Sequence, residues 1–344
     1  MTRKVSMSAA INEAMKLAMR KDENVILIGE DVAGGAAIDH LQDDEAWGGV
    51  LGVTKGLVQE FGRERVLDTP ITEAGYVGAA MTAAATGLRP IAELMFNDFI
   101  GTCLDQVLNQ GAKFRYMFGG KAQVPVTIRT TYGAGFRAAA QHSQSLYALF
   151  TSIPGIKVVV PSTPYDAKGL LLAAIEDNDP VIFFEDKTLY NMTGEVPEGY
   201  YTIPLGKADI KRAGKNLTIV AIGKQVHTAL KAAEQLAKKG IEVEVVDPRS
   251  LSPLDEDTIL SSVAKTNRLI IIDEANPRCS MATDIAALVA DKAFDSLDAP
   301  IKRITAPHTP VPFSPFLEDI YLPTPQKVLE VVSELLGNKT LLSL

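Results

Sequence analysis

The strongest constraint on the fold of this chain is the regular alternation of short strand-like runs with helical patterns. Runs rich in Val, Ile, Leu and Phe are typical of buried strands. Six such runs fall within the first 190 residues, at 25–28, 66–68, 89–93, 124–129, 157–160 and 181–184. This alternation is characteristic of βαβ units, which place helices on both faces of a mostly parallel sheet. We therefore predict an α/β fold.

The alternation is interrupted once, which divides the chain into two predicted domains. Residues 185–214 contain several Gly, Pro and Tyr and show neither a period of 2 nor one of 3.6. We predict a first domain at 1–190, a linker at 191–214 and a second, smaller α/β domain at 215–344. In the second domain, strands at 217–223, 241–246 and 268–273 alternate with helices at 226–239, 255–265 and 281–294. The 344 residues also exceed the roughly 250–300 at which a single hydrophobic core stops growing.

Charge and composition exclude several classes of partner. The chain has 42 Asp and Glu against 34 Lys and Arg, a net charge of −8, and no basic cluster longer than Lys238-Lys239, so nucleic acid is not an expected partner. The longest aliphatic runs, such as 269–272, are far shorter than the roughly 18 residues that span a bilayer. Cys103 and Cys279 are too few for a disulfide framework, and the first residues lack a secretory apolar segment. We therefore expect a cytoplasmic protein with no membrane contact.

Several catalytic motifs are missing. The P-loop, HExxH and the nucleophile elbow GxSxG are absent, and the four histidines are scattered, so no metal site is predicted. One dinucleotide-binding pattern, GAGFRA at 133–138, follows a predicted strand. A nicotinamide site also requires an acidic residue about 20 positions further on, but no Asp or Glu occurs between Asp105 and Asp166. A Gly-rich active-site loop or a plain turn explains the pattern better.

The densest chemical signal surrounds Glu73. Thr72 is placed as a helix N-cap, and the helix that follows consists almost entirely of Gly, Ala and other small residues, which allows close backbone approach. Glu73 is the only carboxylate between Asp68 and Glu93. Burial would raise its pKa and the helix N-terminus would lower it, and a solvated Glu that only supports the helix dipole is equally consistent with the residues.

Three further groups follow predicted strands or loops. Met95, Phe96 and Phe99 lie where a strand ends, a place where open α/β sheets bind ligands, although core packing explains them equally well. His142 lies in a polar segment after a Gly- and Ala-rich loop and could act as an acid or base, or be structural. The pair Glu30-Asp31 directly follows the first strand and could be a solvated loop pair.

At these residues the chain resembles the β subunit of the thiamine-diphosphate-dependent first component of 2-oxo acid and acetoin dehydrogenase complexes. The resemblance covers essentially the whole chain. It rests on IGEDV at 28–32, DTPITE at 68–73, GLRPI at 87–91, QHSQ at 141–144 and PSTPYDAKGL at 161–170. It implies a pyrimidine-binding domain with a parallel sheet, followed by a transketolase C-terminal-like domain.

The resemblance also assigns roles to the candidate residues. Glu73 would hydrogen-bond the aminopyrimidine ring nitrogen of thiamine diphosphate and so assist removal of the thiazolium C2 proton. Phe99 would stack on the pyrimidine with Met95 beside it, and His142 would lie near the substrate and the lipoyl arm. Glu30, with Asp31, would occupy an acidic position between paired active sites. The loop at 174–180 corresponds to one that offers carbonyls to a monovalent cation in some relatives.

The resemblance implies partners as well. The superfamily binds the diphosphate and Mg²⁺ through a Gly-Asp-Gly motif, which this chain lacks. An α subunit that holds that half of the cofactor is therefore expected, in an α2β2 heterotetramer. The C-terminal domain is expected to dock the dihydrolipoyl acyltransferase core, through acidic residues that meet a basic domain.

The segment after the first strand points to the substrate. Residues 33–52 are longer than in pyruvate dehydrogenase β subunits, and AWGGVLG at 46–52 and ELMFNDF at 93–99 are similar to the acetoin branch. We expect acetoin cleavage to acetaldehyde, with transfer of the two-carbon unit to lipoamide. The alternative reaction is oxidative decarboxylation of pyruvate or of a branched-chain 2-oxo acid. A second alternative is that the chain has no catalytic role and only serves as a scaffold for the α chain. The acidic stretch 39–45 is predicted to be a surface loop.

Overall fold

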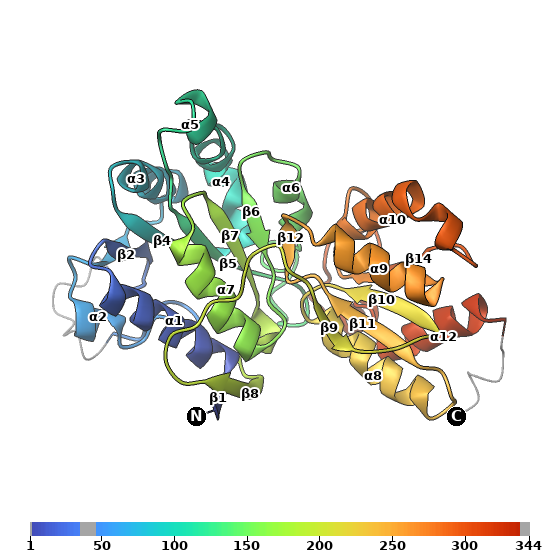
Figure 1. Cartoon of the computed structure of the whole chain (residues 1–344). Coiled ribbons are helices and arrows are strands. Elements are labelled where there is room, and N and C mark those ends of the chain that lie inside the picture. Colours follow the sequence, from blue (N-terminus) through green and yellow to red (C-terminus); the bar gives the residue numbers. More distant parts are fainter. Residues whose placement is uncertain (1, 35–45, 338–344) are drawn as a thin grey trace. The chain divides into compact units, whose positions relative to one another are not determined.

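The computed structural model describes residues 2–34 and 46–337, and its internal contacts divide them into two compact units (Figure 1). The first unit contains residues up to 132 together with 149–205, and the second contains 133–148 together with the residues from 206 onward. The chain therefore leaves the first unit after a strand, contributes one loop to the second, and returns. The predicted acidic loop at 39–45 lies outside the described residues.

The first unit is built on a parallel sheet, as the α/β prediction requires. Its strands, in spatial order, are β6 (Lys157–Val159), β7 (Val181–Asp186), β5 (Thr127–Tyr132), β4 (Arg89–Phe96), β2 (Val25–Glu30) and β3 (Val66–Thr69). All six overlap the predicted strand-like runs, although β5 begins and ends three residues later than the predicted run at 124–129. Every residue of β5 and β7 is buried, although β5 contains three threonines and Arg129, whereas β7 begins with four apolar residues.

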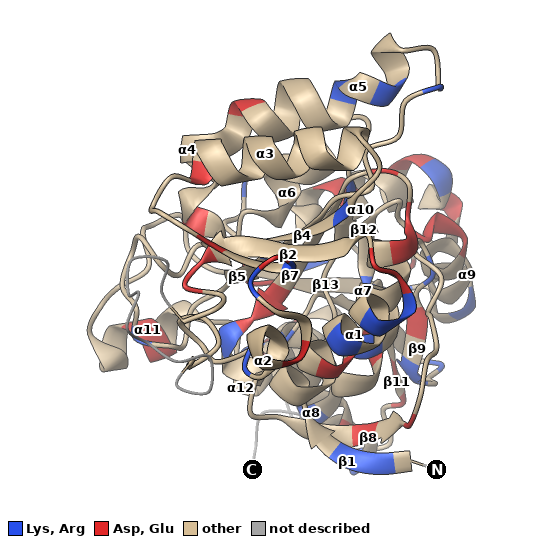
Figure 2. Cartoon of the chain, turned by 90° about the vertical axis from the view of Figure 1, so that its left-hand side faces the viewer, with Lys and Arg blue, Asp and Glu red and all other residues tan. Residues whose placement is uncertain are grey.

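Helices cover both faces of this sheet (Figures 1 and 2). One face carries α1 (Met7–Lys21) and α7 (Pro164–Glu176), which contact each other, and the other carries α3 (Glu73–Ala85) and α4 (Ile100–Asp105). The remaining short elements are α2 (Leu57–Phe61), the 3-10 helix η2 (Asn97–Phe99), the π-helix η3 (Gln106–Gly111), α5 (Ala112–Met117), α6 (Tyr147–Thr151) and η4 (Lys187–Leu189).

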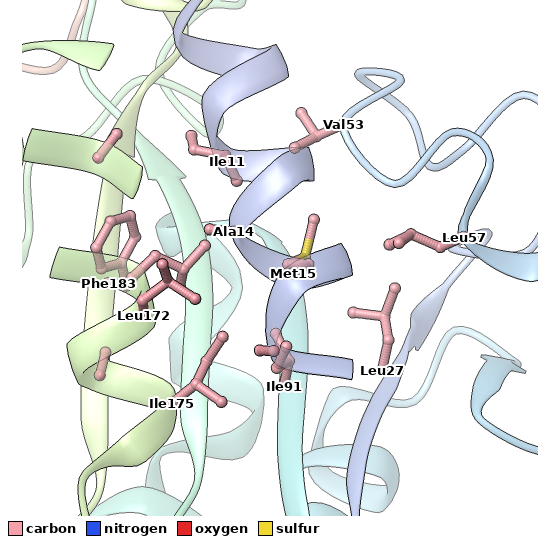
Figure 3. Packing of buried hydrophobic residues seen from close by; sticks show 14 of the residues in the cluster. Ile11, Ala14, Met15, Leu27, Val53, Leu57, Ile91, Leu172, Ile175 and Phe183 are labelled. Atoms are coloured by element: carbon pink, nitrogen blue, oxygen red, sulfur yellow. The ribbon is translucent and has the colours of Figure 1, made fainter. Parts of the chain in front are cut away.

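The core of the first unit is organised around α1 (Figure 3). Ile11, Ala14 and Met15 recur at helical spacing and are fully buried, so they form the apolar stripe that faces the sheet and α7. Their neighbours in the cluster come from elements on either side of α1, and include Leu27, Val53, Leu57, Ile91, Leu172, Ile175 and Phe183. Each large apolar side chain buried here stabilises the fold by about 1.5–3 kcal/mol. Ser6 caps the helix by accepting a hydrogen bond from the Ala9 amide.

The second unit repeats the α/β pattern on a smaller sheet. Its strands, in spatial order, are β14 (Lys302–Thr305), β13 (Leu269–Asp273), β10 (Leu217–Ala221), β11 (Val243–Asp247) and β9 (Asp209–Arg212), of which only β9 is antiparallel to its neighbour. Its other elements are α8 (Gln225–Ala237), β12 (Ser250–Ser252), α9 (Glu256–Thr266), α10 (Met281–Lys292), η5 (Phe294–Ser296), α11 (Pro315–Tyr321) and α12 (Pro325–Leu335).

Five short strands in the described part of the chain have no counterpart among the predicted elements: β12 and β14 of the second unit, and the three described next. β8 (Thr193–Pro197) and β9 lie at 191–214, where no periodicity predicts an element, and β8 pairs antiparallel with β1 (Thr2–Ser6). β1, β8 and β9 each have only four or five residues, with much of their surface exposed, so none of these three carries the apolar signal of a buried strand. Within the described residues no helix combines the length and apolarity needed to cross a membrane.

Candidate functional site

The carboxyl ends of β2 and β3 bring two carboxylates to one edge of the first sheet. Glu30 is the last residue of β2 and pairs in register with Thr69, the last residue of β3. The chain then turns through Thr72, the N-cap residue, and Glu73 begins α3. Parallel strands all end at the same edge, so Glu30 and Glu73 meet there although 43 residues separate them in the sequence.

The direction of the pKa shifts at this edge agrees with the proximity of the two acids. Burial, then the charge of Asp31, then the charge of Glu73 raise the pKa of Glu30 above its usual value. Burial and the Glu73 carboxylate also raise the pKa of the buried Cys103 thiol on α4 to about 12. Tyr76, one turn after Glu73, has its pKa raised by burial and by Cys103, Glu73 and Glu30. Tyr76 thus lies within electrostatic range of Glu30, Glu73 and Cys103, which makes these four residues one candidate site.

Glu73 is neither a fully solvated nor a fully buried residue. Its side chain is half-buried, and among the described residues it forms no ion pair and no hydrogen bond. Figure 2 shows α3 without charge along nearly its whole length. Thr72 is the N-cap residue as predicted, but its side chain makes no capping hydrogen bond. The Thr69 hydroxyl next to it is buried and has no hydrogen-bond partner within the described part of the chain. The two carboxylates are thus accessible without a protein partner among the described residues, and the Thr69 hydroxyl is a buried polar atom whose hydrogen bonding is unsatisfied.

Met95 and Phe99 lie at the same edge, where β4 ends beside β2. Both are half-buried. Phe99 contacts Phe96 edge to face, with 5.5 Å between the ring centroids, and the Met95 carbonyl accepts a hydrogen bond from the Thr131 hydroxyl at 2.5 Å. Met95 and Phe99 are therefore held at the ends of neighbouring strands and are not fully buried in the core.

A buried charge network beneath Met95 was not predicted. Arg129 donates from Nη1 to Glu93 at 2.6 Å and from Nε and Nη2 to the two carboxylate oxygens of Glu185 at 2.7 and 2.9 Å. The Tyr190 hydroxyl donates to Glu185 at 2.6 Å. Burial raises the pKa of Glu93 despite the Arg129 charge. The available signal was the occurrence of charged residues inside otherwise apolar strands, where they face each other across the sheet.

His142 belongs to the second unit, so it is described with its own loop rather than with Glu73. The loop spans 133–148, and the half-buried His142 donates its backbone amide to the Ala139 carbonyl at 3.4 Å. A cavity of about 270 Å³ in the second unit adjoins the loop and is lined by Ser145, Glu274, Asn276 and His308, among others. The next helix begins only at Tyr147. The GAGFRA pattern therefore lacks the helix N-terminus on which a dinucleotide would rest.

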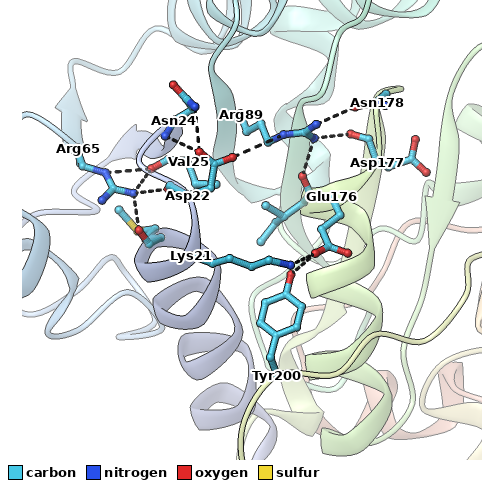
Figure 4. Close-up of polar contacts among 12 residues, drawn as sticks. Lys21, Asp22, Asn24, Val25, Arg65, Arg89, Glu176, Asp177, Asn178 and Tyr200 are labelled. Carbon is cyan, nitrogen blue, oxygen red and sulfur yellow. Dashed lines mark hydrogen bonds and ion pairs between the residues drawn. The ribbon is translucent and has the colours of Figure 1, made fainter.

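Two carbonyls in the 174–180 segment are paired with the Arg89 side chain (Figure 4). Arg89 donates from Nη1 to the carbonyls of Ile175 and Asp177, each at 3.1 Å, and from Nη2 to the Asn178 side chain at 2.7 Å. The Asp177 carboxylate accepts from Lys157 at 2.6 and 2.7 Å. No group of three or more His, Cys, Asp or Glu side chains among the described residues is arranged to hold a metal ion.

Comparison with known proteins places this geometry in a class. Residues 3–193 match the family "Transketolase, pyrimidine binding domain" and residues 206–328 match "Transketolase, C-terminal domain". The structure of a split gene transketolase, an inactive β4 tetramer, is similar with a TM-score of 0.75 over 97% of this chain and 99% of that chain, at 21% identity. The fold is that of the transketolase-like, thiamine-diphosphate-dependent enzymes.

Sequence relatives then give the family within that class. The chain is 83% identical to the acetoin:2,6-dichlorophenolindophenol oxidoreductase subunit beta of Bacillus subtilis, over 99% of this chain and 100% of the relative. It is 62% identical to the same subunit of Cupriavidus necator, over 95% and 96%, and 46% identical to the pyruvate dehydrogenase E1 component subunit beta of Bacillus subtilis, over 96% and 98%. The chain belongs to the family of these acetoin and 2-oxo acid dehydrogenase β subunits, as the motifs predict.

The residues at the sheet edge fit the pyrimidine half of thiamine diphosphate. Ionised carboxylates only accept hydrogen bonds, and an aminopyrimidine that carries a ring proton offers N–H donors. Glu30 and Glu73 provide such acceptors without a competing cation within the described residues, and the Thr69 hydroxyl provides a further polar atom. Met95 and Phe99 supply apolar surface at the same edge.

Proposed function

We propose that this chain is the β subunit of an enzyme that cleaves acetoin to acetaldehyde and transfers the remaining two-carbon unit to lipoamide. The observation that carries this proposal is the 83% identity, over essentially full length, to a subunit named for acetoin oxidation. The relatives named for pyruvate and 2-oxoisovalerate are only 46% and 43% identical. Oxidative decarboxylation of pyruvate or of a branched-chain 2-oxo acid is the second candidate.

The proposed role of Glu73 is to hold a proton on the aminopyrimidine ring. When bound, thiamine diphosphate supplies a carbon nucleophile that adds to a carbonyl and stabilises the negative charge left by carbon–carbon cleavage. The Glu73 carboxylate would accept the hydrogen bond from the ring N–H, and its half-buried position would keep that bond from being replaced by water. Phe99 and Met95 would cover the ring on its apolar side. His142 would donate or accept a proton at the substrate oxygen.

The proposed role of Glu30 is electrostatic. Its raised pKa results from burial and from the neighbouring charges of Asp31 and Glu73. A carboxyl in this state takes up a proton more readily than a solvated glutamate, so it can share a proton with its surroundings near Glu73. We propose that it tunes the proton on the cofactor ring rather than contacting substrate.

The other half of the cofactor would be held by an α subunit. The chain has no Gly-Asp-Gly motif for the diphosphate and Mg²⁺, and its relatives are named as beta subunits. We propose an α2β2 heterotetramer with Mg²⁺ on the α side. The C-terminal domain, in the division 1–190, 191–214 and 215–344, would dock the dihydrolipoyl acyltransferase core. We also propose a cytoplasmic location.

The substrate is tested with the α and β subunits produced together. The purified assembly, with thiamine diphosphate, Mg²⁺ and 2,6-dichlorophenolindophenol, is offered acetoin, pyruvate and 2-oxoisovalerate in separate reactions. Dye reduction should be fastest with acetoin by at least about tenfold in kcat/KM, which corresponds to about 1.4 kcal/mol of transition-state discrimination. Faster turnover of pyruvate than of acetoin would contradict acetoin cleavage and favour the second candidate, oxidative decarboxylation. No dye reduction with any of them would favour a noncatalytic scaffold.

A further inference from the structure

The loop that carries His142 has an unusual backbone. Gly133, Gly135, Arg137 and Ala139 have φ values of +92°, +103°, +63° and +62°. The two glycines adopt this region without steric cost, but Arg137 and Ala139 each lose roughly 1–2 kcal/mol there. Strained backbone of this kind persists only when the surrounding structure determines it. The groups that contact this loop must therefore hold its backbone in place.

Two buried carboxylates hold it, one at each part of the loop. At the base, Glu274 accepts hydrogen bonds from the Ala134 amide at 3.2 Å and the Ser145 hydroxyl at 2.9 Å, and pairs with Lys224 at 3.0 Å. Further along, Glu318 on α11 accepts from the Gly135 amide at 2.6 Å and from Arg137 Nη1 at 2.7 Å. Glu318 is 0% exposed. All of these residues belong to the second unit.

The two contacts of Glu318 hold the strained segment at residues 135–137. Its two oxygens bind a backbone amide and a side chain that lie two residues apart, on either side of Phe136. Arg137 makes two more contacts to α11, to the Pro315 carbonyl at 3.1 Å and to Asp319 at 2.6 Å. The guanidinium thereby fastens the backbone at 137 to α11. Five residues later the chain reaches His142.

From this geometry we infer that Glu318, acting through Arg137, is a positioning residue that sets the location of His142 for catalysis. The inference rests on the proposed function, in which His142 moves a proton at the substrate. Misplacement of a reacting group by about 1 Å can cost roughly 100-fold in rate. The contact would therefore affect turnover without Glu318 itself touching substrate or cofactor.

The test is a pair of substitutions made in two backgrounds of the co-produced αβ assembly. Glu318→Gln keeps the volume and one acceptor but removes the charge that holds Arg137, and Arg137→Met breaks the same contact from the other side. Each is made in the unchanged chain and in a His142→Ala chain. Glu330→Gln is the matched control, because Glu330 is an exposed glutamate of the same unit that, among the described residues, pairs with Lys327 alone. Acetoin-dependent dye reduction, melting temperature and subunit assembly are measured for all.

With His142 present, both substitutions should lower kcat by roughly 10- to 100-fold, leave KM for acetoin within about twofold, and leave assembly intact. With His142→Ala, they should change kcat by less than about twofold, because the residue they position is gone. An equal loss in both backgrounds would show a structural role and overturn the inference, as would no loss in either. If the Glu318→Gln chain does not fold, the result for Arg137→Met decides between the two roles, because the Arg137 side chain is partly exposed and its replacement is less disruptive.

Failure of the proposed function gives a different result. If His142→Ala alone leaves turnover unchanged, or if the unchanged assembly does not turn over acetoin, the role of His142 or the substrate is wrong whatever the Glu318 variants do.

Discussion

Arg129 and Glu185 form a two-point ion pair in the interior of the first unit, with Nε–Oε1 and Nη2–Oε2 distances of 2.7 and 2.9 Å. Their side chains are 2% and 1% exposed. A guanidinium and a carboxylate at such depth are stable only because each satisfies the other and because Glu93 and Tyr190 complete the network. The pair connects β5 and β7 next to the edge that carries Met95.

Breaking this pair should be costly. Arg129→Met leaves the Glu185 carboxylate buried without its counter-charge, so the free energy of unfolding should fall by about 3–5 kcal/mol. Arg20→Met is the control, because Arg20 forms the same two-point contact with Glu60 at 2.5 and 2.9 Å but on the surface, where such a pair contributes about 0–1 kcal/mol. Urea unfolding of both variants measures the difference. Equal losses would show that the Arg129 network is not desolvated.

Glu30 should make the stability of the chain depend on pH. Its pKa in the folded state lies above the usual 4.5, so the folded chain binds this proton more tightly than the unfolded chain. The resulting stabilisation is present below pH 4.5 and is lost as the pH rises through the raised pKa. Glu30→Gln should therefore raise the melting temperature at pH 8, by an amount that shrinks as the pH approaches 4.5.

Thermal unfolding of the isolated chain across this pH range, with the exposed Glu64→Gln as control, measures the effect. A constant difference between Glu30→Gln and the unchanged chain at every pH would mean that Glu30 is an ordinary solvated carboxyl.

The two cysteines should react at very different rates. Cys103 is buried and its pKa is raised to about 12 by burial and by Glu73, so at pH 8 only about one molecule in ten thousand carries the reactive thiolate. Cys279 is exposed. Titration of the native chain with a thiol-specific chromogenic disulfide should therefore release one equivalent rapidly and a second only after unfolding in guanidinium. Rapid release of two equivalents from native protein would contradict the described packing of α4 against α3.

Gly155 should tolerate no side chain. It has a φ of +98°, and a Cβ atom there would lie 2.0 Å from the Ala112 carbonyl oxygen. Gly199 has a φ of +77° but open space around it, so it serves as the matched control. Gly199→Ala should cost about 1 kcal/mol from the backbone alone, and Gly155→Ala about 2–4 kcal/mol because the backbone must also shift. Equal destabilisation, measured by urea unfolding, would refute the close approach.

The sequence predicts the buried strands because they depend on local signals, and it singles out Glu73 as a candidate for the same reason. Most strands of the first sheet contain apolar runs, and Glu73 stands out as a lone acid before a helix of small residues. The proximity of Glu30 to Glu73 was not predicted, since it depends on which strands end side by side. The short strands β1, β8 and β9 were missed because exposed edge strands carry no apolar period.

Contacts between distant residues were beyond the reach of local patterns. Glu318 meets Arg137 across 181 positions, and Arg129 meets Glu185 across 56. Arg129 lies within a predicted strand, which is a signal of burial, but nothing in the sequence identifies its partner, and Glu318 and Arg137 carry no such signal. The GAGFRA pattern at 133–138 is a further case, because its glycines serve a strained loop held by carboxylates rather than a phosphate group.

The central claim is that the Glu73 carboxyl holds a proton on the cofactor ring, and its most direct test is acetoin-dependent dye reduction by the co-produced αβ assembly carrying Glu73→Gln. The exposed Glu64→Gln is the control, and assembly and thiamine diphosphate binding are measured alongside. The account predicts intact assembly with kcat lowered by roughly 100- to 10,000-fold for Glu73→Gln, against an unchanged rate for Glu64→Gln. Undiminished turnover by a fully assembled Glu73→Gln enzyme would contradict it.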